Sequence, residues 1–256
     1  MKPRISVITI TYNAAAVLQP TLDSVLQQDY QHVEHLIIDG ASTDDTLHLV
    51  SLYQEASDEQ ASAHDVVVSS EPDRGIYDAM NKGLQRATGD FVVFLNAGDS
   101  LPTPGTLTLV AEHCEPDSAV LYGDTDIVDA QRQFICHRRL SPPDHLTWRS
   151  FRQGMLVCHQ AFYARTDLAK ATPYNLNYRF SADVDWCIRV MKAAEQRQLA
   201  LTRVNAVVAN YLQEGTTTRN HRASLLERFS VMRSHYGLPT TLMMHFWFVL
   251  RGVFKR

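Results

Sequence analysis

The first hundred residues alternate between strand-like and helix-like segments, and this alternation constrains the fold more than any other feature of the sequence. Apolar runs of strand length occur at residues 5–10, 35–39, 66–69 and 91–95, and helical spacing of apolar residues fills the intervals between them. Strands that alternate with helices in this way form a parallel sheet with right-handed crossovers. The sequence lacks the G-x-G-x-x-G and G-x-x-x-x-G-K-[ST] motifs, which argues against a dinucleotide-binding fold or a P-loop NTPase. We therefore predict an α/β fold with a mostly parallel central sheet.

Residues 69–101 combine a loop, a helix, a turn, a strand and an acidic loop, and the rest of the chain is predicted to be arranged around them. In the loop, Asp73 is placed to cap a helix that begins near Gly75. Residues three and four positions apart share one face of a helix. One face of this helix is therefore expected to carry the polar residues Asp78, Asn81 and Lys82.

Acidic residues follow the predicted strands where the strands end. Asp39 ends the second strand, and residues 91–95 lead into Asn96-Ala-Gly-Asp99 at the end of the fourth. Ligands of open α/β sheets bind at this edge, so we expect these side chains to face a ligand. Together with Asp73 and Asp78 the carboxylates would repel each other unless a cation lay between them. Mg²⁺ or Mn²⁺ carrying a diphosphate would suit this edge, although any single Asp is equally typical of a turn.

Four segments of the chain resemble family 2 glycosyltransferases, especially enzymes of colanic-acid and other polysaccharide clusters. The segments are residues 9–13 (TITYN), 38–46 (IDGASTDDT), 70–83 (SEPDRGIYDAMNKG) and 94–99 (FLNAGD). The resemblance is strong over residues 4–101 and weaker over 155–190. It implies a GT-A fold, in which a mostly parallel sheet is flanked by helices and followed by a smaller antiparallel, acceptor-side part. It also implies a nucleotide-sugar donor, linked to UDP, GDP or dTDP.

The resemblance assigns a role to each matching residue. Asp39 would accept hydrogen bonds from the nucleotide base, and Asp99 would ligate a divalent cation, Mg²⁺ or Mn²⁺. The acidic signature of the family is reduced here, because Asn96 and Gly98 stand where acidic residues are common. The requirement for a metal is therefore left open. The donor-binding residues implied in this way are Thr11, Tyr12, Asn13, Asp39, Asp73, Asp78, Asn81, Lys82 and Asn96.

Residues 181–186 (SADVDW) match the place where the family carries its catalytic base, at the start of a later helix. Asp183 would deprotonate an acceptor hydroxyl, which attacks the anomeric carbon in one inverting displacement. A helix N-cap is the alternative for Asp183, and a first-turn residue that favours the helix dipole is the alternative for Asp185. His159 and Gln160, expected inside a strand over 155–163, match a pair on the acceptor side of relatives. A buried core histidine is the alternative for His159.

The C-terminal part of the chain differs in charge from the rest. Residues 216–256 hold seven Lys or Arg and one Glu, a net charge of +6, which leaves −10 for residues 1–215. The acidic body would repel nucleic acid, whereas a basic, aromatic-rich tail suits an anionic membrane surface. The apolar run 242–250 is too short to span a bilayer and is expected to form an interfacial helix, or to pack on the body or on a second subunit. Residues 214–218 stand where relatives have a loop over the diphosphate, with His221 just beyond.

These observations combine into one predicted organisation. Residues 1–215 form a single GT-A catalytic domain, with a donor half (1–101) and an acceptor half (102–215), followed by a basic helical tail (216–256). The N-terminus lacks the layout of a signal peptide, and four scattered cysteines indicate reduced thiols. We therefore expect a cytoplasmic protein, peripheral on the inner face of the membrane.

The predicted activity is inverting transfer of a sugar to a lipid-linked glycan acceptor. A sugar-1-phosphate nucleotidyltransferase is one alternative, although its glycine-rich N-terminal loop is absent. A sugar-nucleotide-binding or scaffold protein is the other alternative, which Asn96 and Gly98 keep open.

Overall fold

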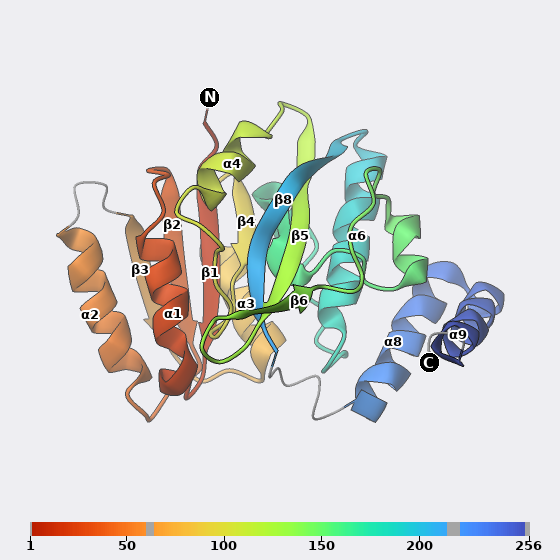
Figure 1. Ribbon diagram of the computed structural model, residues 1–256, viewed down its shortest axis with the longest axis horizontal. Helices are drawn as coiled ribbons and strands as arrows, with labels where there is room; N and C mark the ends of the chain where they lie inside the picture. Colours follow the sequence, from red (N-terminus) through yellow and green to blue (C-terminus); the bar gives the residue numbers. More distant parts are fainter. Residues whose placement is uncertain (1, 60–63, 214–220, 254–256) are drawn as a thin grey trace.

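A computed structural model describes residues 2–59, 64–213 and 221–253 and shows a central sheet covered by helices (Figure 1). The sheet has eight strands in the order β3-β2-β1-β4-β7-β5-β6, and β8 pairs with β5 outside this path. The strands are β1 (Ile5–Thr11), β2 (Val33–Asp39), β3 (Asp65–Ser70), β4 (Phe91–Phe94), β5 (Ser118–Val128), β6 (Phe134–His137), β7 (Phe162–Arg165) and β8 (Ala200–Leu212). The predicted α/β class is confirmed.

Helices occupy the intervals that the sequence predicted. In the first half they are α1 (Ala15–Leu26), α2 (Thr46–Asp58), α3 (Ile76–Arg86) and α4 (Thr106–Glu112). In the second half they are α5 (Thr166–Ala171), α6 (Ala182–Gln196), α8 (His221–Tyr236) and α9 (Leu238–Val253). Two short 3₁₀ segments, η1 (Trp148–Gln153) and η2 (His159–Ala161), precede β7.

Strands β1 to β4 form the parallel part of the sheet. β1 pairs in parallel with β2 on one side and with β4 on the other, and β2 pairs in parallel with β3. Every residue of β1 and β2 is buried, because helices cover both faces of a parallel sheet. The register places Thr11 beside Asp39 and Asp39 beside Ser70, so the carboxyl ends of three strands meet at one edge.

The second half of the sheet is mixed. β7 runs antiparallel to both β4 and β5, and β5 pairs antiparallel with β6, in agreement with the antiparallel part that the resemblance implies. β7 is antiparallel to both β4 and β5, so β4 and β5 run in the same direction, and β8 is parallel to β5. The carboxyl ends of β4, β5 and β8 therefore lie at the same edge of the sheet as those of β1, β2 and β3. An isolated bridge between Ser100 and Asn210 ties the acidic loop after β4 to the end of β8.

The predicted strand over residues 155–163 is wrong. The strand begins at Phe162, and residues 159–161 form η2 instead. The backbone N–H of Ala161 donates to the carbonyl oxygen of Cys158 at 3.0 Å, which closes a turn. The His159 ring stacks on Phe94 with a centroid distance of 5.0 Å. A long apolar run does not distinguish a strand from a buried turn, because both carry buried side chains.

Helices α8 and α9 lie at the end of the molecule opposite α2 (Figure 1). Val231 and Met232 of α8 are buried, and α8 packs against both α6 and α9. The basic segment is therefore helical where it is described, as predicted. Within the described ranges, no helix has the combined length and apolar character needed to cross a membrane.

Candidate active site

The edge formed by β1, β2 and β3 is organised by the buried carboxylate of Asp39. Its two oxygens accept hydrogen bonds from the hydroxyls of Thr11 (3.0 Å) and Ser70 (2.6 Å), and from both the hydroxyl and the backbone N–H of Ser42. Burial alone would raise the pKa of Asp39, but these hydrogen bonds outweigh it and hold the pKa below its ordinary value. Asp39 thus holds three loops together, and its contact with a nucleotide base stays a prediction.

Tyr12 and Asn13 lie at the surface of this edge. The Tyr12 side chain is 67% exposed, which leaves one face of an aromatic ring open beside the strand ends. Asn13 adopts a φ of 46°, and its side-chain oxygen accepts a hydrogen bond from the backbone N–H of Thr43 at 2.9 Å. A Cβ added to Gly40 would lie 2.5 Å from Asp73 Oδ2, so the loops after β2 and β3 are in close contact.

The predicted cap of α3 is wrong in its detail. Gly75 is the N-cap residue with a φ of 117°, a conformation that favours glycine. Asp73 accepts a hydrogen bond from the Gly75 N–H at 2.7 Å, which is a local turn and not a contact with the first turn of the helix. Asp78 accepts from the Arg74 N–H at 3.0 Å and forms an ion pair with the Arg74 guanidinium.

Asn81 and Lys82 are both engaged within the protein. Asn81 donates to the carbonyl oxygen of Tyr174 at 3.1 Å and accepts from its N–H at 2.7 Å, which joins α3 to the segment before α6. The Lys82 ammonium donates to the carbonyl oxygen of Pro72 at 2.7 Å and so supports the loop after β3. The structure thus gives both residues supporting contacts, and their roles toward a donor stay predictions.

Asp99 lies beneath the end of β8 and is buried. Its Oδ1 accepts a hydrogen bond from the Leu212 N–H at 3.0 Å, and its Oδ2 accepts one from the Gln160 amide at 2.7 Å. Burial raises the pKa of Asp99 to about 7, even though these two contacts and the nearby Arg132 guanidinium lower it. Asn96 Oδ1 is also buried and has no hydrogen-bond partner among the described residues.

A metal ion at this edge would have one protein carboxylate to bind. No group of three or more His, Cys, Asp or Glu side chains with the geometry of a metal site occurs in the described part of the chain. Mg²⁺ is commonly held by one or two carboxylates together with substrate phosphates, and not by an all-protein cage. Asp99 fits that arrangement, with the unpartnered Asn96 Oδ1 as a further oxygen three residues away.

Asp183 lies in the first turn of α6 and is half-buried. The helix N-cap is Ser181, so the alternative in which Asp183 caps the helix is wrong. The Tyr77 hydroxyl donates to Asp183 Oδ1 at 3.2 Å. Burial raises the pKa of Asp183, partly offset by the Arg228 guanidinium of α8 and by the Tyr77 hydrogen bond. A carboxylate with a raised pKa is a stronger base than an exposed one.

The turn that carries Asp183 is held by Glu227, a residue of α8 that the sequence interpretation missed. The Glu227 carboxylate accepts hydrogen bonds from three successive backbone N–H groups, those of Arg179 (2.6 Å), Phe180 (2.6 Å) and Ser181 (2.8 Å). The positive end of the α6 dipole also stabilises a carboxylate at this position. Its sequence signal was slight: Glu227 is the single acidic residue of the basic tail.

Asp185 is used inside the protein. Its carboxylate accepts hydrogen bonds from Arg189 (2.7 Å) and from His235 of α8 (2.7 Å), which outweigh the effect of burial and lower its pKa. It therefore links α6 to α8, and its role on the acceptor side stays a prediction.

His159 and Gln160 differ in their surroundings. The His159 ring is buried between Phe94 and Trp186 and hydrogen-bonds to the Tyr174 hydroxyl, and burial lowers its pKa to about 3. This geometry agrees with the alternative of a core histidine. Gln160 contacts Asp99 directly. The predicted loop 214–218 and the side chain of His221 lie outside the described residues.

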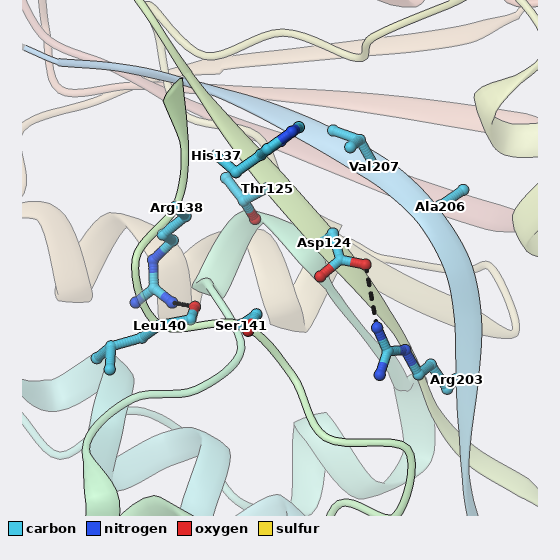
Figure 2. A pocket seen from close by; sticks show the side chains of 9 residues that line it. All are labelled: Asp124, Thr125, His137, Arg138, Leu140, Ser141, Arg203, Ala206 and Val207. Carbon is cyan, nitrogen blue, oxygen red and sulfur yellow. Dashed lines mark hydrogen bonds and ion pairs between the residues drawn. The ribbon is translucent and has the colours of Figure 1, made fainter. Parts of the chain in front are cut away.

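A cavity of about 450 Å³ lies between β5, β8 and residues 137–141, and none of the predicted site residues lines it. Figure 2 shows the Asp124–Arg203 ion pair on one side of the cavity and Arg138 with Leu140 on the other. The Arg138 guanidinium also donates to the carbonyl oxygens of Met155 and Leu156, which lead to the Cys158–Gln160 segment. The sequence patterns had not indicated this cavity.

Comparison with known proteins identifies relatives of this chain. The model of the family described as "Glycosyl transferase family 2" matches residues 6–170. A PGL/p-HBAD biosynthesis glycosyltransferase of Mycobacterium bovis is 36% identical over 218 residues, which are 83% of this chain and 78% of the relative. The putative teichuronic acid biosynthesis glycosyltransferase TuaG of Bacillus subtilis is 41% identical over 98 residues, which are 38% of this chain and 37% of the relative.

Solved structures share the fold. S. aureus TarS in complex with UDP-GlcNAc superposes with a TM-score of 0.70 at 21% identity, covering 90% of this chain and 64% of that one. The mannosyltransferase PcManGT of Pyrobaculum calidifontis, in complex with GDP-Man and Mn²⁺, gives a TM-score of 0.64 at 20% identity, covering 96% and 69%. These likenesses confirm the predicted GT-A architecture.

Proposed function

The chain belongs to glycosyl transferase family 2 and is a glycosyltransferase, and from this premise we propose that it moves a sugar from a nucleotide-sugar to a glycan hydroxyl with inversion. The nucleotidyltransferase alternative does not fit this family. One observation supports the proposal: a series of side-chain contacts links the two carboxyls Asp99 and Asp183. Gln160 donates to Asp99, and its neighbour His159 hydrogen-bonds to the Tyr174 hydroxyl. Tyr174 stacks on Tyr77, whose hydroxyl donates to Asp183.

In the proposed reaction Asp183 takes the proton of the acceptor hydroxyl. The hydroxyl oxygen then forms a bond to the anomeric carbon while the bond from that carbon to the diphosphate oxygen breaks. The raised pKa suits Asp183 to this role, since proton transfer is most effective when the pKa of the base approaches the working pH. The Tyr77 hydroxyl, which donates to Asp183, orients the carboxylate.

The donor would bind across the carboxyl ends of β1, β2 and β3. The exposed Tyr12 ring would pack against the nucleotide base, beside the network centred on Asp39. Asp73, Asp78 and the polar face of α3 would lie toward the ribose and diphosphate. TarS with UDP-GlcNAc and PcManGT with GDP-Man are structural neighbours, so both uridine and guanosine donors belong in the first screen.

Asp99 is the residue that would hold a divalent cation together with diphosphate oxygens. Such an ion, when bound, neutralises charge on the departing diphosphate. PcManGT and a mycobacterial glucosyl-3-phosphoglycerate synthase are both structural neighbours in complexes with Mn²⁺, which supports a divalent cation here. The Gln160 amide, which donates to Asp99 Oδ2, would keep the carboxylate in place.

The acceptor is proposed to be a lipid-linked glycan, met at the inner face of a membrane by a cytoplasmic enzyme. We assign the donor half to residues 1–101 and the acceptor half to residues 102–215. The related proteins from M. bovis and B. subtilis are named for PGL/p-HBAD and teichuronic acid biosynthesis, which supports a cell-envelope glycan as acceptor class.

Release of nucleoside diphosphate tests the proposal. The protein with Mn²⁺ is incubated with UDP-, GDP- and dTDP-sugars, with and without a glycan acceptor, after a thermal-shift screen of the same donors. We expect one donor to stabilise the protein and to release its nucleoside diphosphate faster when acceptor is present. Stabilisation by a donor without any release would instead support the sugar-nucleotide-binding alternative.

A further inference from the structure

Apolar side chains gather on the outer face of α9. Five of them are between 52% and 66% exposed, and they recur along the helix at positions that share one face. They are Leu242, Met243, Phe246, Trp247 and Val249. The inner face of α9 is occupied: Thr241 is buried, and the His245 ring packs edge-on against Phe229 of α8 at 5.0 Å. Nothing in the described part of the chain covers the outer face.

The charge around this face has one sign. After Glu227 the sequence contains no Asp or Glu through residue 256, whereas it contains five Lys or Arg. The exposed Arg233 belongs to α8, and Arg251, Lys255 and Arg256 follow the apolar run directly. An apolar helix face combined with basic residues is the pattern of helices that bind anionic lipid interfaces.

The dimensions of α9 favour a position in the plane of the interface. Its 16 residues span about 24 Å along the axis, which is shorter than the hydrocarbon core of a bilayer. Trp247 is of the residue type that prefers the depth of lipid headgroups, and Phe246 suits the apolar face of an interfacial helix. A charged residue within 242–250 would prevent such burial, and this segment contains none.

We propose that the outer face of α9 docks on an anionic lipid surface, with the basic residues that follow Glu227 paired to lipid phosphates. Lipid is favoured over a second copy of the chain by the charges. In a symmetric dimer the same patch meets itself, so the charged residues that flank it are basic on both copies, and no carboxylate after Glu227 is present to pair them. An anionic headgroup layer supplies the missing negative charge. This inference does not depend on the sugar-transfer proposal.

Vesicle binding without donor or acceptor tests the inference. The whole protein is sedimented with vesicles of phosphatidylglycerol and phosphatidylcholine, and with vesicles of phosphatidylcholine alone. We expect binding to the anionic vesicles, weakened by high salt. The double variant Phe246→Glu with Trp247→Glu should lower the partition coefficient at least about 10-fold, since both the apolar contact and the charge balance are lost.

The control is Leu52→Glu, set against Leu242→Glu. The two leucines are similarly exposed, at 48% and 53%, but Leu52 lies on α2 at the other end of the molecule. We expect Leu242→Glu to reduce binding and Leu52→Glu to leave it unchanged. Equal loss in both variants, or no binding of the folded wild type to anionic vesicles, would overturn the inference. A dimer in solution that Leu242→Glu converts to a monomer, without vesicle binding, would assign the face to a second copy.

Discussion

Replacing Glu227 by Ala tests whether α8 holds the proposed catalytic base in place. The Glu227 carboxylate is the shared acceptor of three backbone N–H groups at the start of α6, two residues before Asp183. Without it this turn loses its anchor to α8. We therefore expect kcat to fall about 10- to 100-fold, because small displacements of catalytic groups have effects of this size. The KM for the donor should change little, since the proposed donor site lies at the carboxyl ends of β1, β2 and β3 and not on α6 or α8.

The loss of stability can be estimated from the same contacts. The N–H of Arg179 is exposed and regains water in the variant, whereas the hydrogen bonds from Phe180 and Ser181 are part-buried and are lost. A hydrogen bond to a charged group contributes about 1.5–3 kcal/mol, so the loss of two of them gives about 3–6 kcal/mol for Glu227→Ala. Glu227→Gln keeps one oxygen acceptor and should cost about half as much. Urea denaturation measures both values.

The pH–rate profile separates a positioning role from a structural one. Burial raises the pKa of Asp183, and a loosened turn would hydrate its carboxylate and bring that pKa back down. The acid limb of kcat should therefore move to lower pH in Glu227→Ala. Glu195→Ala, at the other end of α6, removes an exposed ion pair with Arg149 and should change stability little, without moving the limb. A folded Glu227→Ala with wild-type kcat and an unmoved limb would refute the reasoning.

Three further outcomes are expected. Asp183→Asn should lower kcat about 10²- to 10⁴-fold while isothermal titration finds donor affinity unchanged; full transfer activity would contradict its role as base. Asp99→Asn should raise the Mn²⁺ concentration for half-maximal activity at least about 10-fold, and an unchanged Mn²⁺ titration would remove Asp99 from the metal site. His35 is buried between Thr9 and Tyr53, and burial lowers its pKa to about 3, below the ordinary 6.5. As the pH falls from 6.5 toward 3, a proton therefore binds to this histidine in the unfolded chain but not in the folded protein. The free energy of unfolding should then drop by about 1.4 kcal/mol per pH unit. Urea denaturation at successive pH values measures this slope, and His35→Gln should flatten it.

The parallel half of the fold could be predicted because its strands are buried on both faces. A run such as residues 5–10, bounded by polar residues and followed by a helical pattern, has one reasonable interpretation. The segment 155–163 is equally apolar but contains a turn, since His159 packs between aromatic rings from distant parts of the chain. The two rings, Phe94 and Trp186, lie 65 and 27 residues away in the sequence, and packing at such separations leaves no periodic signal.

The candidate site was only partly predictable in the same way. The positions of Asp99, after β4, and of Asp183, in the first turn of α6, could be predicted because each stands at the start or end of an element that the pattern itself locates. Their roles came from the family resemblance and stay predictions. The supporting contacts could not be predicted: Asn81 binds the backbone of Tyr174, 93 residues away, and Glu227 binds the backbone of residues 179–181. Backbone N–H and carbonyl groups are the same for every residue type, so the sequence at the receiving end carries no mark of the contact.

Helix α8 lies between the helix that carries the proposed catalytic base and the helix that is proposed to bind lipid. On one side, Glu227 and His235 hold α6 at the turn that carries Asp183 and at Asp185. On another side, α8 packs against α9, whose outer face is proposed to rest on lipid. A protein docked in this way would carry Asp183 at a fixed height above the membrane surface, separated from it by α8 and α9. The acceptor hydroxyl of a lipid-linked glycan near its anchor would meet the base there, whereas a hydroxyl far along a long glycan would have to fold back. We therefore expect vesicle-bound enzyme to favour short lipid-linked acceptors over long ones, with the preference lost for Leu242→Glu.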